Sequence, residues 1–479
     1  MMEASEDAED EMMAGGDGVH AETEGKLWRA GDGMGAGEEL DYDSSAYTML
    51  HRLHLEWPCM SFAVVRDNLG EMRTRFPLTT YLVAGTQAER STQNKLICMK
   101  ASHLCCTRHD EDEDAESSDD EADEDPVIEQ QSLPHPGTVN RLKLMPKMSH
   151  ICATWSDMGK VHVWDLSSQL ATLHQPGSGG VPTQQQQPLF TFEGHKDEGY
   201  AIDFSEAQQV DSSEDEEGQL VTGDCKAGIH VWHAAEGGSW RVDPEAYSGH
   251  TASVEDLEWS PVEANVFLSA ACDSTLRVWD VRRKNGSALC VDEGHGVDVN
   301  VISWNRNVNY LVASGADDGT FRIWDLRTFS AAATATPVAK FHWHKAAISS
   351  IEWSPQARSS SLFAFITRDA MLLTGSSTRF LSSCKYVDSQ DSSSIAVSGA
   401  DNQLSLWDLA LEDDPEAEAA ERGREDLRDI PPQLYFVHQG QTDIKELHWH
   451  AQLPGVISST AADSLHIFKP ANAGDGPSS

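Results

Sequence analysis

Short runs in which apolar and polar residues alternate recur along most of the chain, and turn residues separate them. Alternation with a period of two predicts β-strands, because successive side chains of a strand point to opposite faces. The runs group into similar units of about 45 residues, and such an internal period indicates a repeat architecture. Four units align directly, at residues 194–232, 249–282, 294–327 and 344–409, and two weaker copies lie at 135–166 and 444–469.

Each unit fits one four-stranded blade of a WD40 β-propeller, since it combines short strands, turn residues and a closing tryptophan. Further strands are expected at residues 60–65, 76–89 and 94–100. With them the ring reaches seven blades if strands from the two ends of the chain share one sheet, which removes exposed sheet edges. The predicted fold class is therefore all-β, with a seven-bladed WD40 propeller at residues 59–470.

Each complete repeat is expected to bury a chain of polar side chains in which every group has a hydrogen-bond partner. Two repeats contain the full set, which is His250, Ser269, Asp273 and Trp279 in the first and His295, Ser314, Asp318 and Trp324 in the second. In the repeat at 344–409 Val397 replaces the serine, which predicts a shorter chain. In the repeat at 194–232 Lys226 occupies the aspartate position, which predicts a weaker blade.

One stretch breaks the repeat. Residues 356–391 have no counterpart in the sibling units, and Trp324 and Trp407 are 83 positions apart, against 45 and 47 for the two preceding tryptophan intervals. Removing about 35 residues restores the period. The stretch is either a surface loop or translated intron sequence, and its apolar FAFI run favours the second, because such a run would be awkward on a blade surface.

The chain contains 35 Lys and Arg against 78 Asp and Glu, a formal net charge of −43. This charge repels phosphate backbones and attracts basic proteins, so we expect no direct nucleic-acid binding. Residues 110–125 hold 12 acidic residues in 16 positions and should be disordered. Such runs can merely keep a protein soluble, but several on one propeller favour a basic ligand. The tract residues assigned to that ligand are Asp110, Glu111, Asp112, Glu113, Asp114, Asp119, Asp120, Glu121, Asp123, Glu124 and Asp125.

Ahead of the first strand, residues 44–58 predict an amphipathic helix, which Ser44 or Ser45 can cap and Pro58 ends. An alternative is a helix that only packs on a blade. The predicted organisation is a disordered acidic N-terminus at 1–39, a helix at 40–58, the propeller at 59–470 and a disordered tail at 471–479. Within the propeller, non-blade loops are expected at 109–126, 356–391 and 412–429.

Several classes of protein are excluded by what the sequence lacks. No run of about 18 apolar residues occurs, and the acidic start has no apolar core, so we expect no membrane span and no secretory signal. Nine cysteines without a CxxC spacing indicate reduced thiols rather than disulfides or a metal site. No GxSxG, HExxH, P-loop or GxGxxG motif lies in a suitable context, so we expect neither an enzyme nor a cofactor.

Two segments resemble the histone-binding WD40 chaperones. ELDYDSSAYTMLHRLHLEWPCMSF at 39–62 is similar to their N-terminal helix and E-W-P turn, and PPQLYFVHQGQTDIKELHWH at 431–450 is similar to their binding loop. Within that group, FPLTTYLVAGTQAE, LVTGDCKAGIHVW and GGSWRVD resemble the glutamate-rich WD repeat family of ribosome assembly factors. The likeness covers residues 38–470 outside the insertion.

The resemblance implies a nuclear, largely nucleolar protein. It would bind a newly made basic ribosomal protein, the universal large-subunit protein three, and escort it to pre-ribosomal particles. The acidic propeller would cover lysines and arginines of this client until RNA displaces it. Carried onto this sequence, the groove lies between the helix at 47–55 and the loop at 425–432. Its assigned residues are Leu50, Leu53, Glu56, Trp57, Pro58, Asp426, Pro431 and Pro432, of which Leu50 and Leu53 can equally be packing residues.

Two other functions stay open. Histones are also basic helical ligands, so a histone chaperone differs from a ribosomal one only through the family likeness. The chain can also be a substrate receptor of a cullin-RING ubiquitin ligase, since the W-D-x-R pattern that ligase adaptors recognise occurs twice. Those residues are Trp279, Asp280 and Arg282, then Trp324, Asp325 and Arg327. The alternative is that each arginine pairs with a neighbouring blade.

Overall fold

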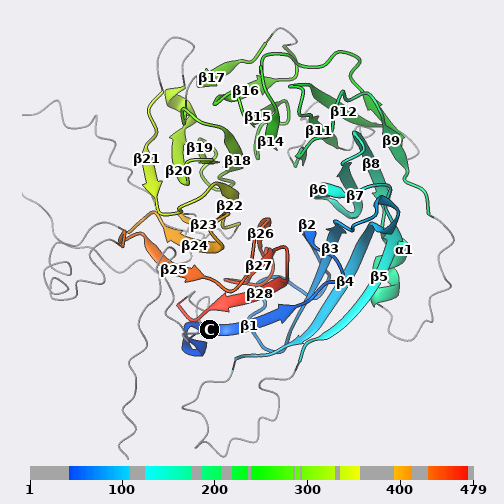
Figure 1. Ribbon diagram of the computed structural model, residues 1–479, viewed down its shortest axis with the longest axis vertical. Helices are drawn as coiled ribbons and strands as arrows, with labels where there is room; N and C mark the ends of the chain where they lie inside the picture. Colours follow the sequence, from blue (N-terminus) through cyan, green and yellow to red (C-terminus); the bar gives the residue numbers. More distant parts are fainter. Residues whose placement is uncertain are drawn as a thin grey trace, which may run out of the picture. The chain divides into compact units, whose positions relative to one another are not determined.

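The computed structural model describes residues 43–107, 125–174, 186–206, 218–235, 239–283, 286–291, 294–329, 335–355, 393–411 and 430–472. These residues belong to one compact unit, Tyr42–Ser479. Their strands form seven four-stranded antiparallel sheets, which follow one another around a ring (Figure 1). The predicted seven-bladed β-propeller is confirmed.

The blades are numbered in chain order, with the innermost strand given first. Blades 1 to 3 contain β2 (Cys59–Val65), β3 (Leu78–Thr86), β4 (Lys95–Leu104) and β5 (Val127–Pro134); β6 (Val139–Met145), β7 (Met148–Ser156), β8 (Lys160–Asp165) and β9 (Phe190–Phe192); and β10 (Ala201–Phe204), β11 (Gln219–Gly223), β12 (Ile229–Ala235) and β13 (Ser239–Val242). Blades 4 to 6 contain β14 (Val254–Trp259), β15 (Val266–Ala271), β16 (Leu276–Asp280) and β17 (Leu289–Val291); β18 (Val299–Trp304), β19 (Leu311–Ala316), β20 (Thr320–Asp325) and β21 (Ala339–His342); and β22 (Ile348–Trp353), β23 (Ser394–Gly399), β24 (Gln403–Asp408) and β25 (Leu434–His438). Blade 7 contains β26 (Glu446–Trp449), β27 (Ile457–Thr460), β28 (Leu465–Pro470) and β1 (Tyr47–Leu53).

Helical structure is sparse in the described part of the chain. An eight-residue helix, α1 (Ser167–His174), follows β8 and buries Leu170 and Leu173 between blades 1 and 2. Three short 3-10 turns lie at Ser44–Ala46, Ser91–Gln93 and Leu326–Thr328. No helix among the described residues is long and apolar enough to cross a membrane.

The predicted helix at 40–58 is wrong. Residues 44–46 form a single 3-10 turn, and β1 pairs with β28 from Tyr47 opposite Pro470 to Leu53 opposite Leu465. The amphipathic pattern was ambiguous, because the buried positions Tyr47, Met49 and Leu53 also fit one face of a strand. The edge of β28 decides the outcome: its backbone groups need partners, and only an extended segment supplies a full ladder of them. The expected sharing of one blade by the two ends of the chain is confirmed (Figure 1).

The polar chain expected in blade 4 is present. The indole N–H of Trp279 donates to the Ser269 hydroxyl at 2.8 Å, and that hydroxyl lies 2.6 Å from Nε2 of His250. Nδ1 of His250 lies 3.0 Å from the carboxylate of Asp273. All these atoms are withdrawn from solvent, so each bond prevents the cost of a buried unsatisfied polar group.

Blade 5 repeats the arrangement with one difference. Ser314 joins Trp324 and His295 at 2.8 and 2.7 Å. Asp318 does not bond to the histidine directly in the described structure, because the Thr320 hydroxyl donates to Asp318 at 2.6 Å and lies 3.5 Å from His295.

The shorter chain predicted for blade 6 is wrong. Val397 does replace the serine, but Ser405 lies directly opposite it on the next strand. Its hydroxyl accepts the indole N–H of Trp407 and lies 2.8 Å from Nε2 of His344, while Nδ1 of His344 lies 2.9 Å from Asp401. A hydroxyl from either strand can therefore occupy the same place.

The weakness predicted for blade 3 has no structural basis, because Lys226 is not the residue that faces the histidine. Asp224, two positions earlier, lies 3.0 Å from Nδ1 of His195. Asp224 also accepts backbone N–H groups, including that of Gly228 at 2.8 Å. Thr222 then links His195 to Trp232 at 2.8 and 2.9 Å.

Neighbouring inner strands are joined by side chains as well as by apolar packing. Among the described residues, at six of the seven junctions a carboxylate or hydroxyl of one inner strand accepts a backbone N–H of the neighbouring inner strand. The pairs are Asp203 with Trp259, Asp256 with Ile302, Ser303 with Trp353, Glu352 with Trp449, Glu446 with Phe62, and Ser61 with Leu142. Each blade thereby helps to satisfy the backbone of its neighbour.

Several segments singled out in the sequence lie outside the described residues. They are the N-terminus at 1–39, the tract residues from Asp110 to Glu124, the insertion at 356–391, the loop at 412–429 and most of the tail at 471–479. Asp125 is described, and it is exposed just before β5. The strands on either side of the insertion, β22 and β23, pair in the same way as the corresponding strands of other blades.

Candidate functional site

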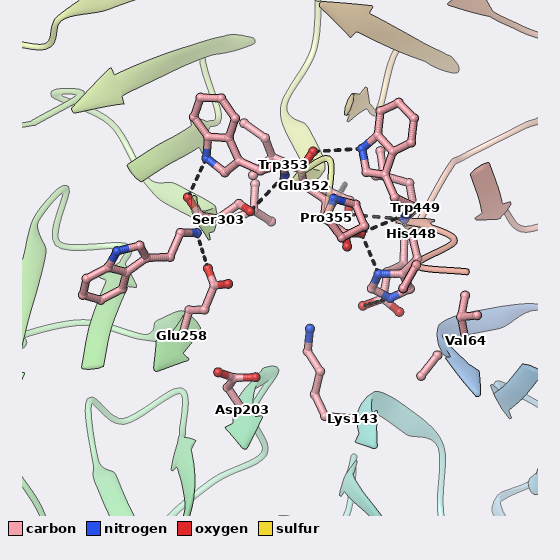
Figure 2. A pocket seen from close by; sticks show the side chains of 18 of the residues that line it. Val64, Lys143, Asp203, Glu258, Ser303, Glu352, Trp353, Pro355, His448 and Trp449 are labelled. Carbon is pink, nitrogen blue, oxygen red and sulfur yellow. Dashed lines mark hydrogen bonds and ion pairs between the residues drawn. The ribbon is translucent and has the colours of Figure 1, made fainter. Parts of the chain in front are cut away.

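A cavity of about 250 Å³ lies in the centre of the ring and is lined by residues from all seven inner strands (Figure 2). Its charges are mostly paired within the protein. Arg141 lies 2.7 Å from Glu446 and 3.8 Å from Asp256, and His448 lies 2.9 Å from Glu352. These pairs tie blade 2 to blades 4 and 7, and blade 7 to blade 6, so the cavity serves ring closure.

Burial and charge together set the protonation of this cavity. Burial raises the pKa of Asp203 to about 6, although the ammonium of Lys143 opposes the shift. Burial alone would lower the pKa of His448, but the carboxylates of Glu352 and Glu446 outweigh it and raise the pKa to about 9. The cavity therefore holds cations and carboxylates in close balance near neutral pH. Among the described residues, no group of three or more His, Cys, Asp or Glu is suited to a metal ion.

The outer rim of blade 7 carries the first set of predicted partner-binding residues. Leu50 is partly buried and packs on the same core as Ala46, Tyr435 and Phe436. The structure thereby brings β1 beside β25, the strand that follows Pro431 and Pro432. Pro432 is exposed and Pro431 half-buried, and the Pro431 carbonyl accepts the Leu434 N–H at 3.0 Å. Asp426 lies outside the described residues.

The other predicted residues lie elsewhere. Leu53 is only 8% exposed and belongs to the core between blades 7 and 1, as expected of a packing residue. Glu56 is exposed and pairs with Lys95 of blade 1 at 3.1 Å. Trp57 and Pro58 are half-buried, and the Pro58 carbonyl accepts the Gln87 N–H at 2.8 Å. The predicted groove residues therefore fall into two groups, one beside β25 and one against blade 1.

A strap that no local sequence pattern indicates covers the outer edge of β1. It consists of residues 105–107, which follow β4 of blade 1. The Thr107 N–H donates to the Thr48 carbonyl at 3.1 Å, and the Thr107 hydroxyl accepts the Leu50 N–H at 3.0 Å. Nε2 of His51 lies 3.1 Å from the Cys105 carbonyl. Thr107 is the last described residue before the acidic tract.

The two W-D-x-R motifs have the same geometry in blades 4 and 5. Trp279 and Trp324 are fully buried. Arg282 pairs with Asp280 at 2.7 Å, and Arg327 pairs with Asp325 at 2.6 Å. Each arginine thus pairs within its own blade rather than with a neighbouring one. The arginine side chains remain 66% and 57% exposed.

The family comparisons agree with this arrangement of strands. The family model of the histone-binding protein RBBP4 and its counterpart in the CAF1 complex matches residues 37–105. The model described as "WD domain, G-beta repeat" matches residues 244–280 and 286–325. Among solved structures, the WD40 β-propeller domain of Doa1 has a TM-score of 0.52 at 13% identity and covers 89% of this chain and 97% of its own, which supports the fold.

Full-length relatives are much more similar. The chain is 46% identical to "Protein HEAT STRESS TOLERANT DWD 1" of Arabidopsis thaliana, covering 93% of this chain and 92% of the relative. It is 43% identical to "Ribosome assembly protein rrb1" of Schizosaccharomyces pombe, covering 92% and 84%. It is 42% identical to "Glutamate-rich WD repeat-containing protein 1" of Dictyostelium discoideum, covering 94% and 85%. With this identity over nearly the whole length, the chain belongs to the family of the glutamate-rich WD repeat-containing proteins.

Proposed function

We propose that this protein is a ribosome assembly factor that chaperones a basic protein of the large ribosomal subunit, the universal large-subunit protein three. Two of its relatives carry names that support such a role, ribosome assembly protein rrb1 and glutamate-rich WD repeat-containing protein 1. The net charge of −43 suits a cationic client. The client's lysines and arginines would be covered until pre-ribosomal RNA replaces the propeller. Such work places the protein in the nucleus and nucleolus.

The observation that carries the proposal is the position from which the acidic tract leaves the fold. The tract follows Thr107, which is bonded to Thr48 and Leu50 of β1. It returns at β5, whose first residue, Val127, pairs with Ser102 of β4. Both ends of the tract are thus tethered beside the rim that carries Leu50. A basic ligand attracted by the tract would therefore arrive at that rim.

Two interactions would then hold the client. Long-range attraction to the tract would raise the association rate, since charged patches mainly affect encounter. Short-range packing on the rim beside β25 would slow dissociation, because apolar contacts are unaffected by salt screening. Leu50, Trp57 and Pro432 are the partly exposed apolar residues that we assign to this step, with Glu56 as a neighbouring carboxylate.

The association rate of the purified client tests the steering step. Replacing the acidic residues of 110–125 by Asn and Gln should lower that rate about tenfold at low salt and much less at high salt. The control is a scrambled tract with the same charge, which should associate as the wild type does. An unchanged rate in the neutralised variant would exclude steering by the tract.

The rim is tested separately by replacing Leu50, Trp57 and Pro432 together. Dissociation should accelerate while the association rate stays the same. The fold is checked by hydrogen exchange of β1, since Leu50 also packs internally. The matched control is Leu189→Ser, an exposed leucine before β9 of blade 2, which should leave dissociation unchanged.

A histone is the second candidate client. The match of residues 37–105 to the histone-binding family model favours it, because that segment includes β1 and the strap. Parallel capture of the large-subunit protein and of a histone H3–H4 complex at moderate salt separates the two. Preferential capture of the histone complex would replace the ribosomal client while leaving the steering mechanism intact.

A ligase adaptor is a third partner, and it does not compete with chaperoning. The observation that favours it is the identical, exposed Asp–Arg geometry of two adjacent blades. Arg282→Ala together with Arg327→Ala should abolish adaptor capture and leave client binding unchanged. Retained adaptor capture by this double variant would remove the motif from consideration.

A further inference from the structure

In its described residues, blade 7 lacks the tryptophan-centred polar chain of blades 2 to 6. Phe468 occupies the position of the tryptophan, and a phenylalanine ring cannot donate a hydrogen bond. Gln441 replaces the histidine and lies 2.5 Å from the Ser459 hydroxyl. The ring is nevertheless closed in this blade, where the first and last strands of the chain meet.

A different set of buried polar groups joins the strands here. The Tyr47 hydroxyl on β1 lies 2.8 Å from Nδ1 of His438 on β25. Nε2 of His438 lies 2.9 Å from Nδ1 of His466 on β28. We call these three residues the histidine latch. All three are buried, with 5%, 1% and 1% of their surfaces exposed.

The latch is complete when both histidines are neutral. The Tyr47 hydroxyl donates to Nδ1 of His438, and Nε2–H of His438 donates to Nδ1 of His466. The ring of His438 also stacks on Phe468, with 4.1 Å between the ring centroids. If His466 took up a proton, its Nδ1 would become a donor, two N–H groups would face each other across 2.9 Å, and the bond would be lost.

We propose that the histidine latch is a proton-sensitive clasp that fixes the first strand of the chain to blade 7 and releases it in mild acid. Release would free Leu50 and the bonds between β1 and the strap, without requiring the inner strands of the ring to separate. The clasp would thereby control the rim to which the proposed client binding is assigned, and in that respect it rests on the proposed function.

The groups facing the latch favour its neutral form. Burial lowers the pKa of His466 to about 4, with a further lowering by Arg52 on β1 and by His54 beyond it, while Asp463 opposes the shift. Burial also holds the pKa of His438 well below its usual range, and His466 and Arg52 add to this effect. Folded-state pKa values below the ordinary 6.5 mean that the latch contributes fully above about pH 6.5 and is lost as the pH falls.

Hydrogen exchange of the full chain tests the clasp. The protection of β1, Tyr47–Leu53, is compared with that of β19, Leu311–Ala316, at pH 7 and pH 5, after correction for intrinsic exchange rates. We expect β1 to lose at least about tenfold more protection than β19, which corresponds to a one-unit change in a linked proton equilibrium. A parallel loss in both strands, or none in either, would overturn the proposal.

Three variants assign the effect. His466→Gln keeps an acceptor for His438 but cannot take up a proton, so the excess loss of β1 protection at pH 5 should shrink. Tyr47→Phe should lower β1 protection at both pH values and retain the pH dependence. The matched control is His295→Gln, which alters a buried histidine of blade 5 and should leave the β1 response unchanged. If H466Q misfolds, the histidine proton signals of the wild type give the same answer, since titration of His466 above pH 6 contradicts the clasp.

The client assay separates this proposal from the previous one. If client capture at pH 7 succeeds but β1 stays protected at pH 5, the clasp fails alone. If β1 opens at pH 5 but no basic client binds at pH 7, the proposed function fails alone.

Discussion

Replacing Ser405 by alanine removes the only hydroxyl that links His344 to Trp407 in the described part of blade 6. The direction of these bonds follows from the charge on Asp401. Because that carboxylate accepts Nδ1–H of His344, Nε2 of His344 is left as an acceptor and takes the Ser405 proton. The serine oxygen in turn accepts the indole N–H. Ser405→Ala therefore leaves one buried donor and one buried acceptor without partners.

The magnitude follows from the burial of these groups. The side chains of His344, Ser405 and Trp407 are all fully buried, so water cannot replace the lost hydroxyl without opening the blade. Each buried unsatisfied group costs about 1–3 kcal/mol, which gives a total of about 2–5 kcal/mol. That range exceeds the usual cost of a surface substitution, which is within about 0.5 kcal/mol.

Urea unfolding followed by tryptophan fluorescence measures the loss as a lower midpoint at an unchanged slope. The chain also offers a rescue. Val397 lies directly opposite Ser405, at the position that Ser269 occupies in blade 4. Val397→Ser in the S405A background should return a hydroxyl to the same place and recover at least about half of the lost free energy of unfolding.

The reasoning fails if S405A lowers the free energy of unfolding by less than about 1 kcal/mol. It also fails if Val397→Ser makes the double variant less stable than S405A, because the hydroxyl would then not be interchangeable between the two strands.

Other substitutions test the remaining polar contacts. Asp224→Ala should cost about 2–3 kcal/mol in urea unfolding, because Asp224 binds His195 and several backbone N–H groups, whereas Lys226→Ala, at a side chain 62% exposed, should change stability by less than about 0.5 kcal/mol. Glu446→Gln should cost about 3–5 kcal/mol in thermal unfolding, since it leaves the arginine of the central cavity without its closest carboxylate; a loss comparable to that of K226A would contradict the role of the pair. Burial lowers the pKa of His135 to about 4, so its contribution to stability is complete above about pH 6.5 and declines as the pH falls, and His135→Gln should flatten the melting temperature between pH 4 and 6.5.

The repeat could be predicted from sequence because it is set by local chemistry. The positions of His250, Asp273 and Trp279 within their unit locate the turn, the inner strand and the third strand, and the structure has all three where they were expected. Ser405 and Asp224 were missed for a physical reason: the buried chain requires a hydroxyl and a carboxylate at points in space, and two different sequence positions can supply each. Position counting within one strand finds only one of them.

The rim could be predicted only in part. Residues 47–53 fit both a helix and a strand, and the unpaired edge of β28, distant in sequence, decides between them. The strap at 105–107 has no sequence signal, because its bonds to Thr48 and Leu50 depend on how the closed ring places blade 1 beside blade 7. Chemistry that depends on contacts between the chain's two ends is thus invisible to local patterns.

The order of synthesis gives the pairing of β1 with β28 a temporal meaning. Tyr47 emerges from the translating ribosome early, whereas its neighbours on β28 emerge more than 400 residues later. At roughly 5–20 residues per second the first strand waits for tens of seconds with its backbone unmatched. During that interval the nascent chain exposes an edge that other proteins can occupy, so folding factors that recognise extended segments would act on residues 47–53 before any other part of the ring.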